Sequence, residues 1–98
     1  MGRELKRILY VEDESDIRTI TAMALEAVGG FTVISCSSGK EALAAAPDAN
    51  ADLILLDVMM PGMDGLATLS ALRGLSQTAD TPVVFMTAKV QASEIQHY

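Results

Sequence analysis

The chain has 98 residues, which is the length of one domain, and half of them are hydrophobic, which excludes a disordered tail. Its formal net charge of −6 excludes the basic surface with which proteins bind nucleic acid or anionic lipid. We therefore expect a single domain over residues 1–98, located in the cytoplasm, with no direct nucleic-acid or membrane partner. The composition also predicts an aliphatic core and a sheet that is buried on both faces.

Short apolar runs alternate along the chain with segments whose apolar residues recur at helical spacing. This alternation is typical of strand–helix–strand units, which build a parallel sheet. In chain order, we expect strand 8–11, helix 17–28, strand 31–34, helix 40–46, strand 53–56, a helix carrying Leu66, Leu69 and Leu72, strand 82–86 and helix 91–98.

Residues that begin and end helices support these elements. Gly29 and Gly30 are expected to end the first helix, because glycine adopts the left-handed conformation that follows many helices. The segment Ser37-Ser38-Gly39 is expected to begin the second helix, and Pro47 to end it. Asp64 is a candidate N-cap for the third helix.

Acidic side chains follow two of the predicted strands. Glu12 and Asp13 come directly after the first strand, and Asp57 comes directly after the third. If these strands are neighbours, three carboxylates meet at the edge where ligands bind to doubly wound sheets. Their mutual repulsion amounts to about 10 kcal/mol at an effective dielectric constant of 20, so the cluster must protonate, splay apart or bind a cation. An oxygen-only ligand set favours Mg²⁺, with Mn²⁺ as a second possibility.

A divalent cation beside an aspartate suggests phosphoryl chemistry. In this interpretation a carboxylate oxygen of Asp57 attacks the phosphorus atom. Thr87, which follows the fourth strand, offers its hydroxyl to a phosphoryl oxygen, and the small Ala88 leaves room for the group.

Three segments resemble the motifs of bacterial response-regulator receiver domains, the CheY-like family. The segment 55–65, with Asp57 and Pro61, resembles the phosphoacceptor signature. The segment 11–14 resembles the acidic pair after the first strand, and Thr87-Ala88 resembles the switch residue and its small neighbour. The resemblance implies a doubly wound α/β sheet in the flavodoxin-like order.

The resemblance also implies a function and a set of site residues. Asp57 would accept a phosphoryl group from a phosphohistidine of a sensor histidine kinase or a histidine phosphotransfer protein. Asp13, Asp57 and the backbone carbonyl of Met59 would hold Mg²⁺, and Glu12 would help through water. Thr87 would couple phosphorylation to a surface that a downstream effector binds. Such a domain takes part in signalling and is not an enzyme acting on a separate substrate.

The chain differs from the family pattern after Tyr98, because receiver domains carry a fifth strand and a further helix. We therefore expect a truncated domain with strand order 2-1-3-4, which lacks the fifth-strand lysine. The fourth strand would be an exposed apolar edge, and such edges favour association. This predicts either a fragment of a longer receiver or a homodimer formed through the exposed edge or face.

Of three other functions, the sequence counts against the first two and leaves the third open. An aspartate-nucleophile phosphatase would need a second aspartate two residues after Asp57, where this chain has Met59. A nucleotide-binding module would need a glycine-rich phosphate loop, and neither common pattern of such loops is present. A receiver-like interaction module that cannot be phosphorylated would keep the fold without the chemistry.

Overall fold

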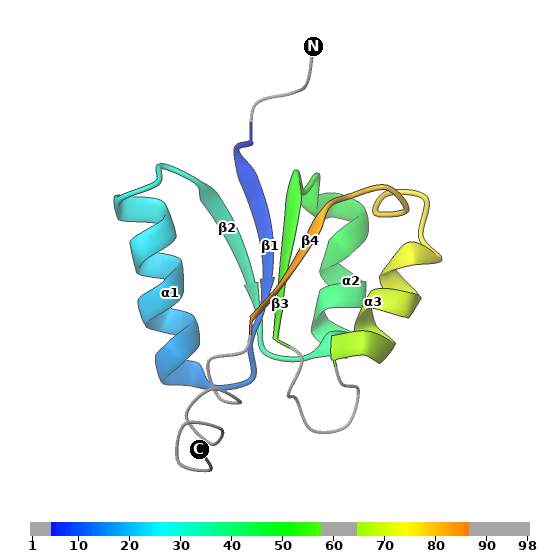
Figure 1. The fold of residues 1–98 in the computed structure, drawn as a ribbon, viewed down its shortest axis with the longest axis horizontal. Coiled ribbons are helices and arrows are strands. Elements are labelled where there is room, and N and C mark those ends of the chain that lie inside the picture. Colours follow the sequence, from blue (N-terminus) through cyan, green and yellow to red (C-terminus); the bar gives the residue numbers. More distant parts are fainter. Residues whose placement is uncertain (1–4, 58–64, 87–98) are drawn as a thin grey trace, which may run out of the picture.

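The structure is a computed structural model that describes residues 5–57 and 65–86, and these form a parallel sheet with helices on both faces (Figure 1). The sheet has four strands in the order β2-β1-β3-β4, which confirms the predicted fold class. In chain order the elements are β1 (Arg7–Val11), α1 (Ser15–Ala27), β2 (Thr32–Cys36), α2 (Gly39–Ala49), β3 (Leu53–Asp57), α3 (Gly65–Arg73) and β4 (Val83–Met86).

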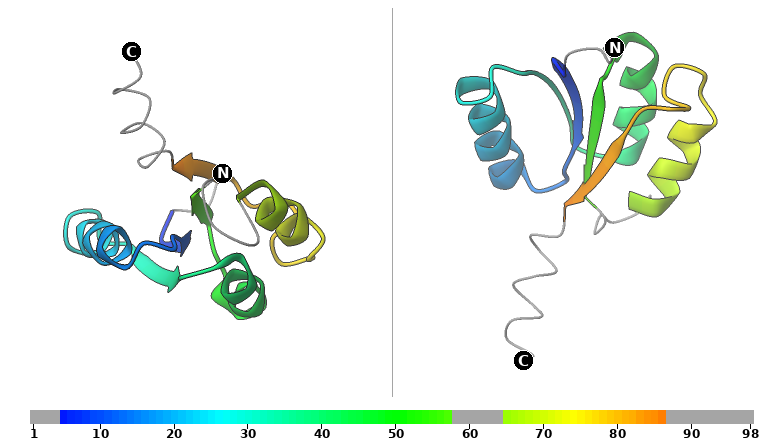
Figure 2. Two further views of the ribbon diagram at one scale, coloured as in Figure 1. Left: turned by 90° about the horizontal axis from the view of Figure 1, so that it is seen from below. Right: turned by 45° about the horizontal axis from the view of Figure 1, so that its top comes forward.

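Three layers make up the molecule, with the sheet in the middle. Helix α1 lies on one face of the sheet, and α2 and α3 lie together on the other (Figures 1 and 2). The core lies between the sheet and the α2–α3 layer, where four alanines allow close packing. The buried residues of this core are Leu9, Val11, Cys36, Ala42, Ala46, Ala49, Ala51, Ile54, Leu56 and Leu72, an aliphatic set as predicted.

Strand register determines which side chains meet at the carboxyl edge of the sheet. Val11 at the end of β1 pairs with Cys36 of β2 on one side and with Leu56 of β3 on the other. The residues that follow Val11 in sequence therefore lie beside Asp57, which ends β3. Parallel strands deliver their next residues to one edge, so this register creates the candidate site.

Helix α1 is less buried than its spacing predicts. None of its residues is fully buried, and Ile20 is 68% exposed. Val28, which caps the helix, is 89% exposed. On the far side of the sheet, Val84 and Phe85 of β4 are 49% and 38% exposed, so the prediction of a sheet buried on both faces is wrong for β4. The face that carries α1 has no other described helix, and β4 is the last of the described strands, so its two faces are less covered than those of the central strands.

The second helix continues past the predicted stop. Pro47 lies inside α2, which runs to Ala49 and ends where Asn50 adopts a left-handed conformation with φ of 49°. A proline removes one backbone hydrogen bond, but Ala46 and Ala49 on either side are buried in the core. Their packing keeps the last turn helical in spite of the lost bond.

Two other boundaries also differ from the sequence prediction. Strand β2 extends to Cys36, two residues beyond the predicted end, because it pairs with β1 along its whole length. In α3 the buried positions are Gly65, Thr68 and Leu72, which repeat at helical spacing. Leu66 lies in α3 as predicted, but it is off this face and is 66% exposed.

The remaining predictions concern the end of α1, residues outside the described ranges and the absence of a membrane span. Gly30 has φ of 71° after α1, as predicted for a residue that ends a helix. The Asp64 cap and the helix over residues 91–98 lie outside the described residues. Within residues 5–57 and 65–86, no helix combines the length and apolar character needed to cross a membrane.

Ser38 caps the start of α2, and Glu41 hydrogen bonds to both Ser38 and the residue before it. Its hydroxyl oxygen accepts from the Glu41 N–H at 3.1 Å, and a Glu41 carboxylate oxygen accepts from the Ser37 N–H at 2.7 Å. The first bond satisfies a backbone donor that the first helical turn leaves without a partner, and the second holds the residue just before the cap.

We expect Ser38→Ala to lower the free energy of unfolding by about 1 kcal/mol, because it removes the acceptor at the N-cap. Ser38→Asp is the matched control, since aspartate also caps helices and should retain the stability. Urea unfolding followed by circular dichroism measures both. Equal losses in the two variants would contradict the capping role.

Candidate metal centre

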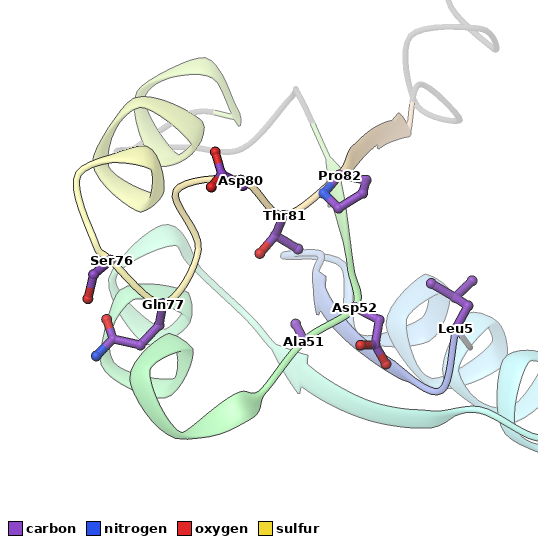
Figure 3. Close-up of a pocket in the computed structure, with 8 residues that line it drawn as sticks. All are labelled: Leu5, Ala51, Asp52, Ser76, Gln77, Asp80, Thr81 and Pro82. Carbon is purple, nitrogen blue, oxygen red and sulfur yellow. The ribbon is translucent and has the colours of Figure 1, made fainter. Parts of the chain in front are cut away.

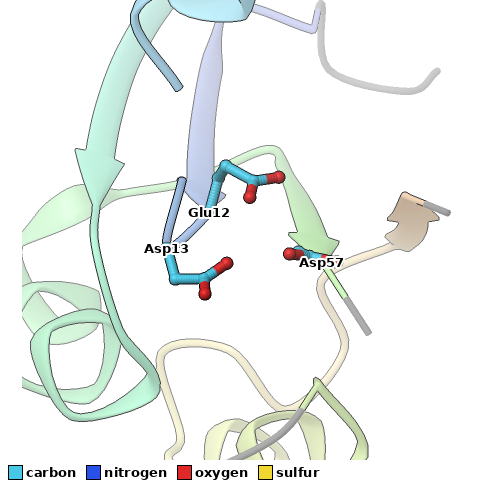
Figure 4. Close-up of side chains that lie close together, drawn as sticks. All are labelled: Glu12, Asp13 and Asp57. Carbon is cyan, nitrogen blue, oxygen red and sulfur yellow. The ribbon is translucent and has the colours of Figure 1, made fainter. Parts of the chain in front are cut away.

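The carboxylates of Glu12, Asp13 and Asp57 meet at the carboxyl edge of the sheet (Figure 4). Each side chain offers one oxygen atom, and these three atoms all lie within 4.8 Å of one another. Glu12 and Asp13 follow β1, and Asp57 is the last residue of β3. The in-register pairing of the two strands therefore brings together groups that are more than forty residues apart in sequence.

Hydrogen bonds hold Glu12 in place at the start of the β1–α1 loop. Its N–H donates to the Cys36 carbonyl at 3.0 Å, which continues the β1–β2 ladder by one residue. Its carboxylate Oε2 accepts from the Glu14 N–H at 3.1 Å. Because the backbone and the side chain are both held, the carboxylate keeps its orientation toward the cluster.

Arg18 also contacts this loop, and the sequence analysis did not single it out. Its Nη1 donates to the Glu12 carbonyl at 2.8 Å and lies 3.5 Å from the Asp13 carbonyl. Arg18 is the fourth residue of α1, and no local sequence pattern points to it. Its contact with the loop exists only because α1 folds back beside the end of β1.

Burial makes the cluster electrostatically costly. Glu12 and Asp57 are 1% and 2% exposed, and Asp13 is half-buried. Two unit charges at this separation repel by about 3 kcal/mol at an effective dielectric constant of 20. A domain of this size is stable by only about 5–15 kcal/mol, so a bound cation would remove a substantial unfavourable energy.

The donor set fits a hard divalent cation. All three side chains offer carboxylate oxygens, and Mg²⁺ and Mn²⁺ prefer such ligands. Asp13 is more exposed than the other two, which leaves room for water ligands on that side. The other predicted site residues, Met59, Thr87 and Ala88, lie outside the described residues.

Cys36 ends β2 at the same edge of the sheet, and its thiol is not part of the cluster. Burial, with a further contribution from the negative charge of Glu41, raises the pKa of Cys36 to about 11. The three ligand atoms that lie close together are all carboxylate oxygens, so the thiol is outside the cluster on geometry. Its contribution to the site is the backbone carbonyl that accepts from Glu12.

A separate pocket of about 410 Å³ lies at the opposite, amino end of the strands (Figure 3). Its wall includes Asp52, whose Oδ2 accepts from the backbone N–H groups of Lys6 and Arg7 at 3.0 and 2.9 Å. These bonds join the start of β1 to the loop before β3. Asp52 therefore has a structural role, and the pocket is distinct from the acidic cluster.

Comparison with known proteins agrees with this geometry. The model of the response regulator receiver domain family matches residues 8–98. The chain belongs to the response regulator receiver domain family. Receiver domains are signalling domains of two-component systems, so the resemblance noted in the sequence is confirmed at the level of the family.

Individual relatives support the same assignment. The transcriptional regulatory protein ResD of Bacillus subtilis is 39% identical over 93 residues, which are 94% of this chain and 37% of ResD. The chain thus spans about a third of the length of such curated relatives. The chemotaxis protein CheY4 of Vibrio cholerae superposes with a TM-score of 0.78 at 32% identity, covering 94% of this chain and 80% of CheY4.

One chain in a solved complex of two signalling proteins is also similar to this chain. The structure of the histidine kinase ThkA with the response regulator protein TrrA has a TM-score of 0.71 at 34% identity, over 82% of this chain and 66% of the matched chain.

In the absence of divalent cations, we expect Asp13→Asn to raise the free energy of unfolding by about 1 kcal/mol, because it removes one charge from a crowded, partly screened cluster. Asp16→Asn is the control. Asp16 lies in the first turn of α1, where a negative charge is favourable, so this variant should lose about 0.5 kcal/mol. Urea unfolding in the presence of a chelator measures both, and a loss of stability in Asp13→Asn would contradict net repulsion in the cluster.

Proposed function

We propose that this receiver domain accepts a phosphoryl group on Asp57 in a Mg²⁺-dependent reaction. The observation that carries the proposal is the convergence of three carboxylates within 4.8 Å at the end of β3. The proposed donor is a phosphohistidine of a sensor histidine kinase or a histidine phosphotransfer protein. The matched complex of ThkA with TrrA supports a histidine kinase as the partner.

The proposed metal ligands are Asp13, Asp57 and the backbone carbonyl of Met59, with Glu12 acting through water. Mg²⁺ is the proposed ion, and Mn²⁺ could replace it because it favours the same oxygen ligands. When bound, the ion would neutralise negative charge on the incoming phosphoryl group. The buried Glu12 would meanwhile keep the electrostatic potential favourable for a cation.

The proposed transfer step begins with a carboxylate oxygen of Asp57. This oxygen attacks phosphorus, and an O–P bond forms while the P–N bond to the donor imidazole breaks. The imidazole leaves with the electron pair of the broken bond and takes a proton from solvent. The product is an aspartyl phosphate, with the phosphoryl group transferred intact.

Thr87 and Ala88 complete the proposed site from the end of the fourth strand. The Thr87 hydroxyl would donate to a phosphoryl oxygen, and Ala88 would leave space for the group. Movement of Thr87 would change the surface that a downstream effector binds. We propose that the domain performs this signalling role in the cytoplasm and does not act catalytically on a separate substrate.

Incubation with Mg²⁺ and acetyl phosphate tests the proposal. We expect a mass increase of one phosphoryl group, which disappears when Asp57→Asn removes the nucleophilic oxygen or when a chelator removes Mg²⁺. Asp48→Ala, which changes an exposed acidic residue of α2, should be modified like the wild type. Intact-mass spectrometry gives the readout. A wild type that neither binds Mg²⁺ nor gains mass would contradict the proposal and favour an interaction module that cannot be phosphorylated.

A second candidate function is association through the edge strand β4. Among residues 5–57 and 65–86, β4 is the last strand on its side of the sheet. Val84 and Phe85 on its two faces are 49% and 38% exposed. An apolar edge with this exposure favours pairing with another strand, here that of a second copy.

If copies pair through β4, the apparent mass should rise with protein concentration, and Val84→Lys should return the protein to monomer by placing a charge at the edge. Val28→Lys adds the same charge at an exposed position after α1 and should leave the association unchanged. Size-exclusion chromatography with light scattering measures both. A monomer at every concentration, with a cooperative melt, would rule out this association.

A further inference from the structure

We infer that Arg18 is a positioning residue that holds the β1–α1 loop in the shape needed to bind the metal. This inference rests on the proposed function, because it concerns the same carboxylate cluster. Arg18 lies in α1, outside the cluster, and its side chain reaches back over the loop that carries Glu12 and Asp13. It acts on the backbone of these residues, through their carbonyl groups.

The contacts around Glu12 show how the loop is held. The Glu12 N–H donates to the Cys36 carbonyl at 3.0 Å, and the Glu12 carbonyl accepts from Arg18 Nη1 at 2.8 Å. The backbone of Glu12 is therefore held on one side by β2 and on the other by α1. The same Nη1 lies 3.5 Å from the Asp13 carbonyl, so the two residues that supply carboxylates share one donor.

The guanidinium is itself well placed to act on this loop. The Arg18 N–H donates to the Glu14 carbonyl at 2.9 Å in the first turn of α1, so the side chain starts from the turn that follows the loop. Arg18 is half-buried, which limits the alternative positions of its side chain. Hydrogen bonds from a charged donor are stronger than those from a neutral one. Arg18 thus ties the loop to the helix at the point where repulsion between carboxylates would otherwise open it.

Two possible roles of Arg18 predict opposite effects on metal binding. As a nearby positive charge alone, Arg18 would repel a cation, so its removal would strengthen the binding of Mg²⁺. As a positioning residue, it keeps Glu12 and Asp13 aimed at the site, so its removal would weaken the binding. The direction of the change therefore separates the two roles.

Arg73 provides a matched control within the same chain. Its Nη1 donates to the carbonyls of Thr78, Ala79 and Thr81 at 3.0, 3.2 and 2.6 Å. These contacts also hold a loop through backbone carbonyls, but this loop precedes β4 at the amino end of the sheet, away from the cluster (Figure 1). Arg73→Met removes the same charge and the same kind of contact as Arg18→Met.

Isothermal titration calorimetry with Mg²⁺ alone tests the inference on the wild type, Arg18→Met, Arg18→Lys and Arg73→Met. We expect Arg18→Met to weaken Mg²⁺ binding about tenfold, as loss of a supporting contact around metal ligands typically does. Arg18→Lys should give an intermediate affinity, because its ammonium can donate to Glu12 but lacks the planar fork. Arg73→Met should bind Mg²⁺ like the wild type.

The outcomes separate this inference from the proposed function. Mg²⁺ binding by the wild type together with equal or tighter binding by Arg18→Met would overturn the role of Arg18 and leave the proposed function standing. Absence of Mg²⁺ binding by the wild type would overturn both. If Arg18→Met does not fold, as judged by circular dichroism, Arg18→Lys decides, because an affinity equal to the wild type would overturn the positioning role.

Discussion

The parallel pairing of β1 with β3 is the constraint on which the rest of this receiver domain depends. Because Val11 lies opposite Leu56, the next residues of β1 arrive beside Asp57 at the same edge of the sheet. A shift of one residue would reverse the side of every side chain in β1 and separate the acidic pair from Asp57. The same register places Leu9 and Val11 in the core, so burial of apolar side chains maintains the geometry of the polar site.

The site is assembled against its own charge repulsion, and backbone contacts oppose that repulsion. Glu12 is almost fully buried, yet its backbone and its carboxylate are both hydrogen bonded. Arg18 adds a charged donor from the helix that follows the loop. Contacts with the sheet and with α1 therefore hold the acidic groups together. A cation at the centre of the cluster would reduce the remaining repulsion between the carboxylates.

The two faces of the sheet differ in how well they are covered. The alanines of α2 let that helix approach the strands closely, and together with Leu72 of α3 they bury one face. On the other face α1 has no fully buried residue, although Ile8 and Tyr10 beneath it are buried. Burial also raises the pKa of the Tyr10 phenol, and the neighbouring Thr21 of α1 acts in the opposite direction. The exposed apolar residues are thus concentrated on α1 and at the β4 edge, the parts of the domain most suited to contact with other molecules.

The amino-acid sequence by itself determined the order of elements, the class of the fold and the identity of the three acidic residues. It could do so because apolar periodicity, turn residues and residues at strand ends are local features. It did not determine that α2 continues through Pro47, that β2 extends to Cys36 or that Leu66 faces solvent, because each depends on which partner packs against the segment. Nor did it single out Arg18, whose role arises only when α1 folds back beside the end of β1. Tertiary structure decided these points, because burial and hydrogen bonding between distant segments outweigh the conformational preferences of single residues.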